Sequence, residues 1–323
     1  MSSSSRALSF AFAAVALCAL GWASRAEAQE QGFAVERLYP SAPGAGWFVM
    51  DDLGMHGGLG GVMALTVGYA HDPLRVQSSD GSQHLAVVSD QTTTDFGFAA
   101  TYERWRFYLN LDMPIATAGQ SGTVGANTFS APHLDLGSFP DTLSDARLGV
   151  DVRLLGHADS SFRLGAGAQL LVPNGNRSDY DTDDTFRAML RALFAGGSGA
   201  FTYAGQLGVH IRPLDDAPVP GSPQGSELLF GFAAGPKFPI EGTATTVVVG
   251  PEFFGATAFK SLFGSSTTAF EGLLSARLEG TRDQGPHVRL KLGMGGGIDA
   301  RFGAPEWRFV FGIEVYDHTG GAQ

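Results

Sequence analysis

The sequence contains almost no cysteine, little charge and no long apolar run beyond residue 21. Its single cysteine, Cys18 among 323 residues, excludes a disulfide scaffold and a cysteine-ligated zinc or iron–sulfur site. Charged residues make up 16% of the chain, whereas a typical soluble domain has about 25%. This argues against an ordinary cytosolic enzyme. The net charge of -11 disfavours nucleic acid as a partner, because proteins that bind it need a basic surface.

Two further absences narrow the function. After residue 21, glycine, proline or a charged residue interrupts every apolar stretch before it reaches the roughly 18 residues of a transmembrane helix. A chain of this kind can therefore cross a membrane only with strands. The motifs G-x-S-x-G, H-E-x-x-H and the phosphate-binding loop are also missing, so a nucleophile elbow, a zincin site and nucleotide hydrolysis have no support.

The N-terminus predicts export. Arg6 precedes an apolar run over 7–21, and Ala26-Glu27-Ala28 has the small-x-small pattern of a signal-peptidase site. We therefore expect residues 1–28 to be a signal peptide, with the mature chain beginning near Gln29. Cys18 would leave with it, and the mature chain would have no cysteine.

Most of the remaining chain alternates with a period of two, which is the pattern of half-buried strands. Between Trp105 and Ile115 the odd positions are all apolar, while Arg106, Asn110 and Asp112 stand among the even ones. The same pattern predicts twelve strands, over 62–76, 87–103, 105–117, 143–156, 160–173, 184–196, 199–213, 226–239, 243–257, 267–280, 287–299 and 306–317.

The connections between these strands indicate a membrane barrel. Longer and shorter connections alternate along the chain, as in outer-membrane barrels with short periplasmic turns and longer extracellular loops. Aromatic residues such as Tyr102, Trp105 and Phe238 gather at the short turns, where an interfacial girdle is expected. We therefore predict an all-β fold, an antiparallel transmembrane β-barrel of about 12 strands (range 10–14) over 62–317. Residues 29–61 are expected to be a periplasmic lead-in or a plug, and 318–323 a short tail.

Charged residues occupy only the inner register of these strands, because a basic residue on the lipid face costs about 2 to 4 kcal/mol at the bilayer midplane. One hypothesis is that basic and acidic arcs face each other and create a transverse field across the lumen. The alternative is that the charges pair with neighbours, as Arg147 would with Asp145 or Asp151, and seal the interior. The residues predicted to line the lumen are the basic Arg147, Arg153, Arg163, Arg187, Arg191 and Arg212 and the acidic Glu227, Glu252, Glu271 and Glu279.

An acidic loop follows the fifth predicted strand. Alternate carboxylates in it resemble the ligands of a hard cation such as calcium, although the glycine and glutamate of an EF-hand loop are missing. A structural calcium ion is therefore weighed against a solvated loop near lipopolysaccharide, and no other cofactor is expected. The four carboxylates are Asp179, Asp181, Asp183 and Asp184.

Three segments carry a family resemblance: 143–154 (LSDARLGVDVRL), 170–176 (LLVPNGN) and 301–312 (RFGAPEWRFVFG). They resemble the barrel domains of outer-membrane protein A family members. They are also similar, more loosely, to transporter barrels linked with the meta pathway of phenol degradation. The resemblance implies an outer-membrane β-barrel and says little about the solute.

These observations predict a passive outer-membrane channel for small polar solutes. Its expected partners are outer-membrane lipid, lipopolysaccharide and the barrel assembly machinery. A non-conducting structural or surface-interaction barrel, with acidic outer loops, is the alternative hypothesis. A barrel enzyme is the third, with His210 on the polar register as its one candidate base, but no partner spacing is recognisable.

Overall fold

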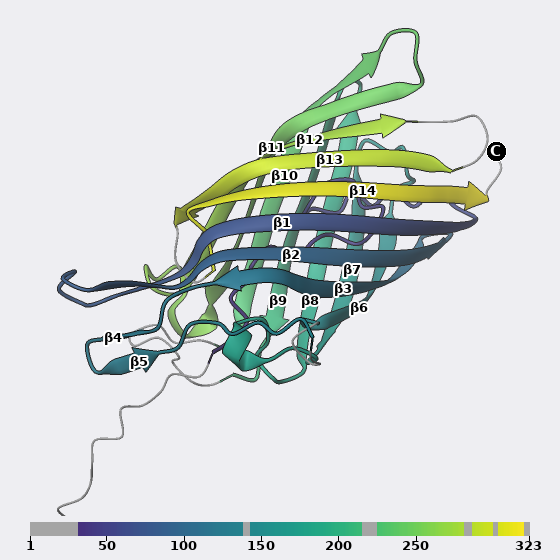
Figure 1. Cartoon of the computed structure of the whole chain (residues 1–323). Helices are drawn as coiled ribbons and strands as arrows, with labels where there is room; N and C mark the ends of the chain where they lie inside the picture. Colours follow the sequence, from purple (N-terminus) through teal and green to yellow (C-terminus); the bar gives the residue numbers. More distant parts are fainter. Residues whose placement is uncertain (1–31, 138–142, 215–224, 281–285, 300–302, 320–323) are drawn as a thin grey trace, which may run out of the picture.

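The structure is a computed structural model that describes residues 32–137, 143–214, 225–280, 286–299 and 303–319. The predicted signal peptide lies outside the described residues. Twelve long strands form the wall in the described part of the chain (Figure 1). They are β1 (Leu59–Gln77), β2 (His84–Tyr102), β3 (Trp105–Ala118), β6 (Ala146–Leu155), β7 (Arg163–Val172), β8 (Arg187–Ser198), β9 (Phe201–Ile211), β10 (Glu227–Ile240), β11 (Thr245–Ala258), β12 (Thr268–Gly280), β13 (His287–Asp299) and β14 (Trp307–Thr319).

The strands close into a barrel. Each pairs antiparallel with its neighbour, and β1 completes the ring by pairing with β14, from Leu59 opposite Thr319 to His71 opposite Trp307. The predicted antiparallel twelve-strand barrel is therefore confirmed, and each predicted strand has its counterpart. Closure leaves no unpaired strand edge in the wall, which is what a barrel in lipid requires.

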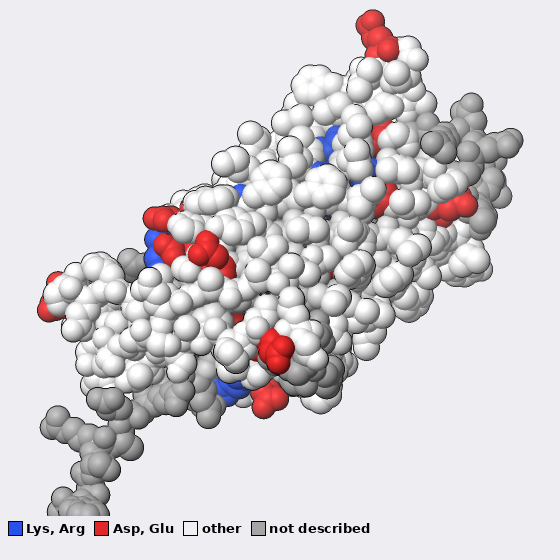
Figure 2. Space-filling model, viewed as in Figure 1, with Lys and Arg blue, Asp and Glu red and all other residues white. Residues whose placement is uncertain are grey.

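The predicted sidedness is visible in the burial of alternate residues. In β3, Trp105 and Phe107 are 39% and 53% exposed. The residues that alternate with them, Arg106 and Tyr108, are 1% and 5% exposed. Figure 2 shows a barrel wall that is largely free of charge, with acidic groups near its two ends. The outer face therefore presents apolar side chains, and the ionised groups of the strands point inward.

None of the helical segments among the described residues has the length and apolarity needed to cross a membrane. Two short 3-10 helices of the described residues, η1 (Arg177–Asp179) and η2 (Phe259–Ser261), are single turns.

The two ends of the barrel differ. Short turns such as 103–104, 199–200 and 241–244 lie at the end where β1 begins and β14 ends, called here the short-turn end. The connections after β3, β7 and β9 lie at the opposite, long-loop end. The loop after β3 contains a small hairpin, β4 (Gly122–Val124) and β5 (Asn127–Phe129), which the sequence did not predict because three-residue strands show no periodicity. Tyr102 and Phe238, 59% and 53% exposed, lie at the short turns as an aromatic girdle would.

Candidate functional site: a plugged lumen

The lumen is occupied by residues 32–58, called here the plug segment. At the long-loop end, the Val35 N–H donates to the Tyr180 carbonyl in the loop after β7, at 3.0 Å. At the short-turn end the segment leads into β1 at Leu59. Figure 1 shows this purple trace running inside the barrel. The sequence left open a periplasmic lead-in or a plug for residues 29–61, and the described part of this range runs through the lumen from the long-loop end to the short-turn end.

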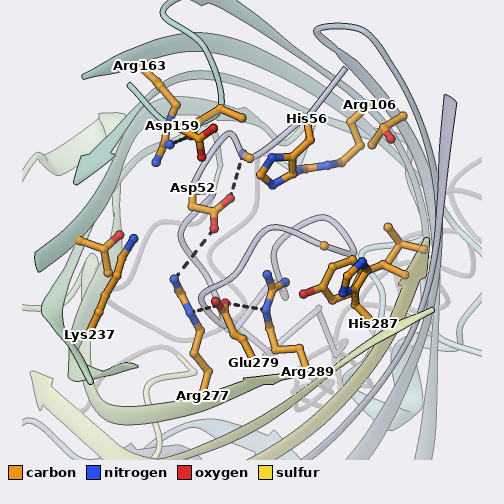
Figure 3. Close-up of a pocket in the computed structure, with 17 residues that line it drawn as sticks. Asp52, His56, Arg106, Asp159, Arg163, Lys237, Arg277, Glu279, His287 and Arg289 are labelled. Carbon is orange, nitrogen blue, oxygen red and sulfur yellow. Dashed lines mark hydrogen bonds and ion pairs between the residues drawn. The ribbon is translucent and has the colours of Figure 1, made fainter. Parts of the chain in front are cut away.

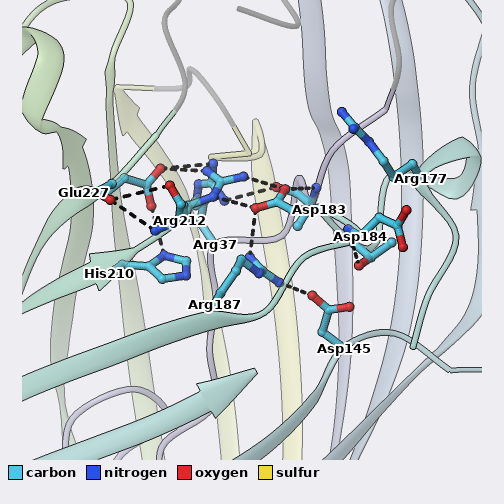
Figure 4. A network of polar contacts seen from close by, with 12 residues as sticks. Arg37, Asp145, Arg177, Asp183, Asp184, Arg187, His210, Arg212 and Glu227 are labelled. Atoms are coloured by element: carbon cyan, nitrogen blue, oxygen red, sulfur yellow. Dashed lines mark hydrogen bonds and ion pairs between the residues drawn. The ribbon is translucent and has the colours of Figure 1, made fainter. Parts of the chain in front are cut away.

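A network of ion pairs holds the start of the plug segment (Figure 4). The Ala34 N–H donates to Asp183 Oδ1 at 2.9 Å, and Arg37 pairs with Glu227 at 3.3 Å. Arg212 links the two acceptors, at 2.7 Å from Asp183 and 3.0 Å from Glu227. Burial alone would raise the pKa of Asp183, but the nearby guanidiniums hold it well below its usual range. The carboxylate therefore stays ionised and continues to accept the hydrogen bond from Ala34 of the plug segment.

Further anchors follow along the plug segment. Glu36 accepts two hydrogen bonds from Arg308, at 2.8 and 2.9 Å, and Arg308 also pairs with Glu271 at 3.0 Å. The Pro40 carbonyl accepts from Arg147 Nη1 at 2.8 Å. These contacts join the segment to two different strands of the wall, β14 and β6, so it is fixed by the barrel and not by its own secondary structure.

In the middle of the lumen the segment turns back on itself. Gly44 and Gly46 have φ of +83° and +90°, a region that favours glycine. A β-carbon at Gly46 would lie 2.4 Å from an Asp52 carboxylate oxygen, so any other residue would have to displace that side chain as well as adopt the positive φ. The turn presents two consecutive N–H groups, of Phe48 and Val49, and the Glu252 carboxylate of β11 accepts both at 2.9 Å.

A hydrophobic cluster fills the space around this turn. Trp47, Phe48, Val49 and Met50 of the plug segment are 0–4% exposed and pack on inward-facing apolar residues of the wall. Because the apolar surface is removed from water on both sides, the cluster stabilises the plugged state. The wall residues of the cluster are Leu193, Ala195, Ala204, Ala233, Val248, Phe254, Leu273 and Val310.

A polar cavity of about 400 Å³ remains at the short-turn end. Figure 3 shows charged side chains of the wall and of the plug segment around it. We call this cavity the vestibule. Two much smaller cavities, of about 30 Å³ each, lie beside Tyr39 of the plug segment, toward the long-loop end.

The residues predicted to line the lumen all lie on inward positions, but the plug segment and nearby partners cover them. Glu279 is partly exposed, and the other nine are at most 8% exposed. Arg153 donates to the carbonyls of Leu53 and Met55, and Arg163 donates to that of Ala158. The remaining predicted residues have ionic or plug-segment partners: Arg147 pairs with Asp95, Arg187 with Asp145, Arg191 with Asp151, Arg212 with Asp183 and Glu227, Glu271 with Arg308, and Glu279 with Arg277 and Arg289, while Glu252 binds the plug segment.

This pairing corrects the idea of a transverse field. Most charges of both arcs are neutralised by a neighbour within 4 Å, which cancels the separation of charge that such a field needs. Local pairing therefore holds, although Arg147 bonds to Asp95 at 2.8 Å and not to Asp145 or Asp151. The sequence missed this partner because Asp95 lies on β2, two strands away from β6.

The acidic loop after β7 does not gather its four carboxylates around one point. Asp183 pairs with Arg212, Asp179 accepts the His133 N–H at 3.0 Å, and Asp181 accepts the Asn176 N–H at 2.9 Å. Asp184 is exposed. The chain's own donors therefore take up three of the four side chains predicted as calcium ligands.

Asp181 makes this loop sensitive to pH. Burial, together with the nearby Asp179 and Asp145 carboxylates, raises its pKa to about 8. A raised pKa means that the folded loop is most stable with Asp181 protonated, and that this stability is lost as the pH rises from about 4 to about 8. We expect Asp181→Asn to remove the loss, measured as the pH dependence of hydrogen exchange at the Asn176 amide. The exposed Asp184→Asn serves as control and should keep the wild-type profile; equal profiles for wild type and Asp181→Asn would contradict this prediction.

One group of potential metal ligands does come together within the described ranges. Donor atoms of His71, Asp72 and Glu306 lie within 4.8 Å of one another at the long-loop end. Arg75 pairs with Glu306 at 3.1 Å, and Asp90 contacts His71 Nδ1 at 3.1 Å. These contacts account for the group without an ion. Sequence reasoning missed it because barrel closure alone brings Glu306 next to β1.

His210, the candidate base, is fully buried. Its Nδ1 lies 3.1 Å from Glu227, and its ring meets that of Tyr39 edge-on at 5.8 Å. The side chain therefore belongs to the network that holds the plug segment (Figure 4). No surface of the imidazole is open to a substrate, since its exposure is 0%.

Comparison with known proteins supports the fold alone. Neither models of known protein families nor curated protein sequences give a match. Among solved structures, an outer-membrane channel of Pseudomonas putida is 12% identical over 80% of this chain and 94% of its own, with a TM-score of 0.50. A FadL homologue of Pseudomonas aeruginosa is 9% identical over 89% of this chain and 96% of its own, with a TM-score of 0.39.

These similarities bear on the resemblance suggested by the sequence. The fold of the chain is that of an outer-membrane β-barrel, as the segments over 143–154 and 301–312 predicted. Membership of the outer-membrane protein A family, or of the phenol-pathway transporters, is not confirmed. Both resemblances rested on barrel strands, which are similar in many unrelated barrels.

Proposed function

We propose that this protein is an outer-membrane channel for small polar solutes whose lumen is closed by the plug segment. The observation that carries the proposal is a charge-lined barrel interior behind an apolar outer face. The vestibule, of about 400 Å³, lies in this interior at the short-turn end. Short turns face the periplasm in outer-membrane barrels. The vestibule is then the periplasmic mouth, and the plug segment is anchored beneath the extracellular loops, near lipopolysaccharide.

Conduction in this proposal requires the plug segment to move. The hydrophobic cluster around Trp47 and Phe48 fills the middle of the lumen, and the Glu252 carboxylate accepts hydrogen bonds from the same turn. Polar contacts such as that of Arg37 with Glu227 hold the start of the segment. Polar contacts can be exchanged for water, so a state with the turn displaced costs less than unfolding any strand of the wall. Channel opening is then rare in the resting protein.

A non-conducting structural barrel is the second candidate, and the filled lumen favours it. Planar-bilayer recordings of the purified full chain separate the two. The channel predicts rare conductance steps whose size is set by the barrel and whose frequency rises when the anchors of the plug segment are weakened. Absence of steps from both wild type and anchor variants that keep the barrel's resistance to unfolding in detergent would leave the structural role.

A further inference from the structure

We propose that the vestibule binds small oxyanions, carboxylates or phosphates. The inference rests on the proposed function only in making these anions the solutes of the channel. Its volume of about 400 Å³ is within the range of small-molecule sites. The side chains in its wall give it a net positive charge.

Most acidic groups of the vestibule lie close to arginines that neutralise their charge. Glu279 lies 2.8 Å from both Arg277 and Arg289. Asp52 of the plug segment faces Arg277 at 4.0 Å, and Asp159 is exposed at the rim. Each buried carboxylate here is therefore compensated already and leaves no surplus negative charge to repel an anion.

Two cations of the same wall have no carboxylate partner among the described residues. Arg163, 8% exposed, donates to the Ala158 carbonyl, which is neutral. Lys237 is half-buried, and its side-chain ammonium forms no hydrogen bond or ion pair with any described residue. Figure 3 shows both side chains at the edge of the cavity. A partly desolvated cation without a counter-charge attracts an anionic ligand more strongly than an exposed one does.

The surplus persists when the groups directly behind the wall are included. Arg106 pairs with Asp51 at 2.5 Å, while Glu314 is shared between Arg289 and Lys291, at 2.6 and 2.7 Å. With Arg153, which bonds only to plug-segment carbonyls, seven cations face five carboxylates. Three of these cations, Arg153, Arg163 and Lys237, form no ion pair with a described carboxylate, and one carboxylate, the exposed Asp159, forms none with a described cation, which leaves the surplus of two.

An unused donor adds to the charge. Arg277 Nη1 is buried without a hydrogen-bond partner, while the guanidinium carbon lies 4.8 Å from the centre of the Trp47 ring. Oxyanions offer several acceptor atoms to N–H groups and form charge-assisted hydrogen bonds with arginine and lysine. A bound cation would leave these donors unsatisfied, and a neutral solute would leave their positive charge uncompensated, so the geometry favours anions.

Isothermal titration calorimetry of the detergent-solubilised full chain tests this inference. The probes are sodium phosphate, sodium succinate and, as a cation, choline chloride. Wild type should bind one or both oxyanions and not choline, which also separates phosphate from carboxylate as the preferred group. Lys237→Gln and Arg163→Gln should each weaken binding by about tenfold or more, whereas Lys237→Arg should retain it.

Arg104→Gln is the matched control, because it removes a positive charge from the short-turn end without altering the vestibule wall. It should bind like wild type. Absence of oxyanion binding by wild type, or unchanged binding by the Lys237→Gln and Arg163→Gln double variant, would overturn the inference. A protein that conducts but binds no oxyanion would refute the inference alone, and one that binds but never conducts would refute the channel alone.

Discussion

Replacing Glu252 by alanine is expected to raise the open population of the channel by at least about a hundredfold, because hydrogen bonds to a charged group contribute roughly 1.5 to 3 kcal/mol each. The variant removes both acceptors from Phe48 and Val49 and leaves their N–H groups unpaired in the closed state. In an open state these groups would meet water. The measurement is the frequency of conductance steps in planar bilayers.

The size of the conductance steps should not change, because the Glu252→Ala substitution removes contacts to the plug segment and leaves the strand pairing of the wall intact. Glu252→Gln keeps one acceptor oxygen and should give an intermediate frequency. Glu241→Gln, in an exposed turn after β10, removes a carboxylate far from the plug segment and should behave as wild type. Equal frequencies for Glu252→Ala and wild type would show that this carboxylate does not hold the gate.

The wall of the barrel could be predicted from the sequence because its determinants are local. Lipid on one side and charge on the other impose a period of two, and the run from Trp105 to Ile115 shows it without reference to the rest of the chain. Strand order follows in turn, since antiparallel neighbours are joined in sequence. Twelve strands and their approximate bounds could be obtained in this way.

The lumen could not be predicted to the same depth, because its contacts are not local. Glu252 meets the N–H of Phe48 across 204 residues, and Arg308 meets Glu36 across 272. No periodicity marks the plug segment, whose shape depends on the barrel around it. The inward position of a charge was therefore predictable, but its partner was not, as Arg147 and Asp95 illustrate.

Charge and apolar packing have different roles along the plug segment. Ion pairs such as Arg37 with Glu227 fix its start under the loops, and these buried pairs specify position more than they add stability. The cluster around Phe48 and Met50 closes the lumen and is stabilised by removal of apolar surface from water. In the proposed channel we therefore expect loss of Glu252 to release the plug segment at its centre, while the contacts at its start stay bound.

A disulfide between the plug segment and β1 should abolish this opening. A β-carbon built on Gly44 lies 3.8 Å from Val62 Cβ, close to the mean separation in disulfides. Cysteine at Gly44 would adopt its positive φ of +83° at a cost of about 1 to 3 kcal/mol. With both residues replaced by cysteine, the turn that carries Trp47 and Phe48 would be tethered inside the lumen.

The disulfide is most informative in the Glu252→Ala background, where frequent openings of the channel are expected. The oxidised Gly44→Cys, Val62→Cys, Glu252→Ala protein should show openings no more often than wild type, and dithiothreitol should restore the high frequency. Each single cysteine variant, in the same background, controls for the substitutions and should be unaffected by dithiothreitol. Openings that persist in the oxidised protein, after gel mobility has shown the disulfide to be complete, would place the conducting path elsewhere than through the turn at 44–50, because a tethered turn cannot leave the lumen.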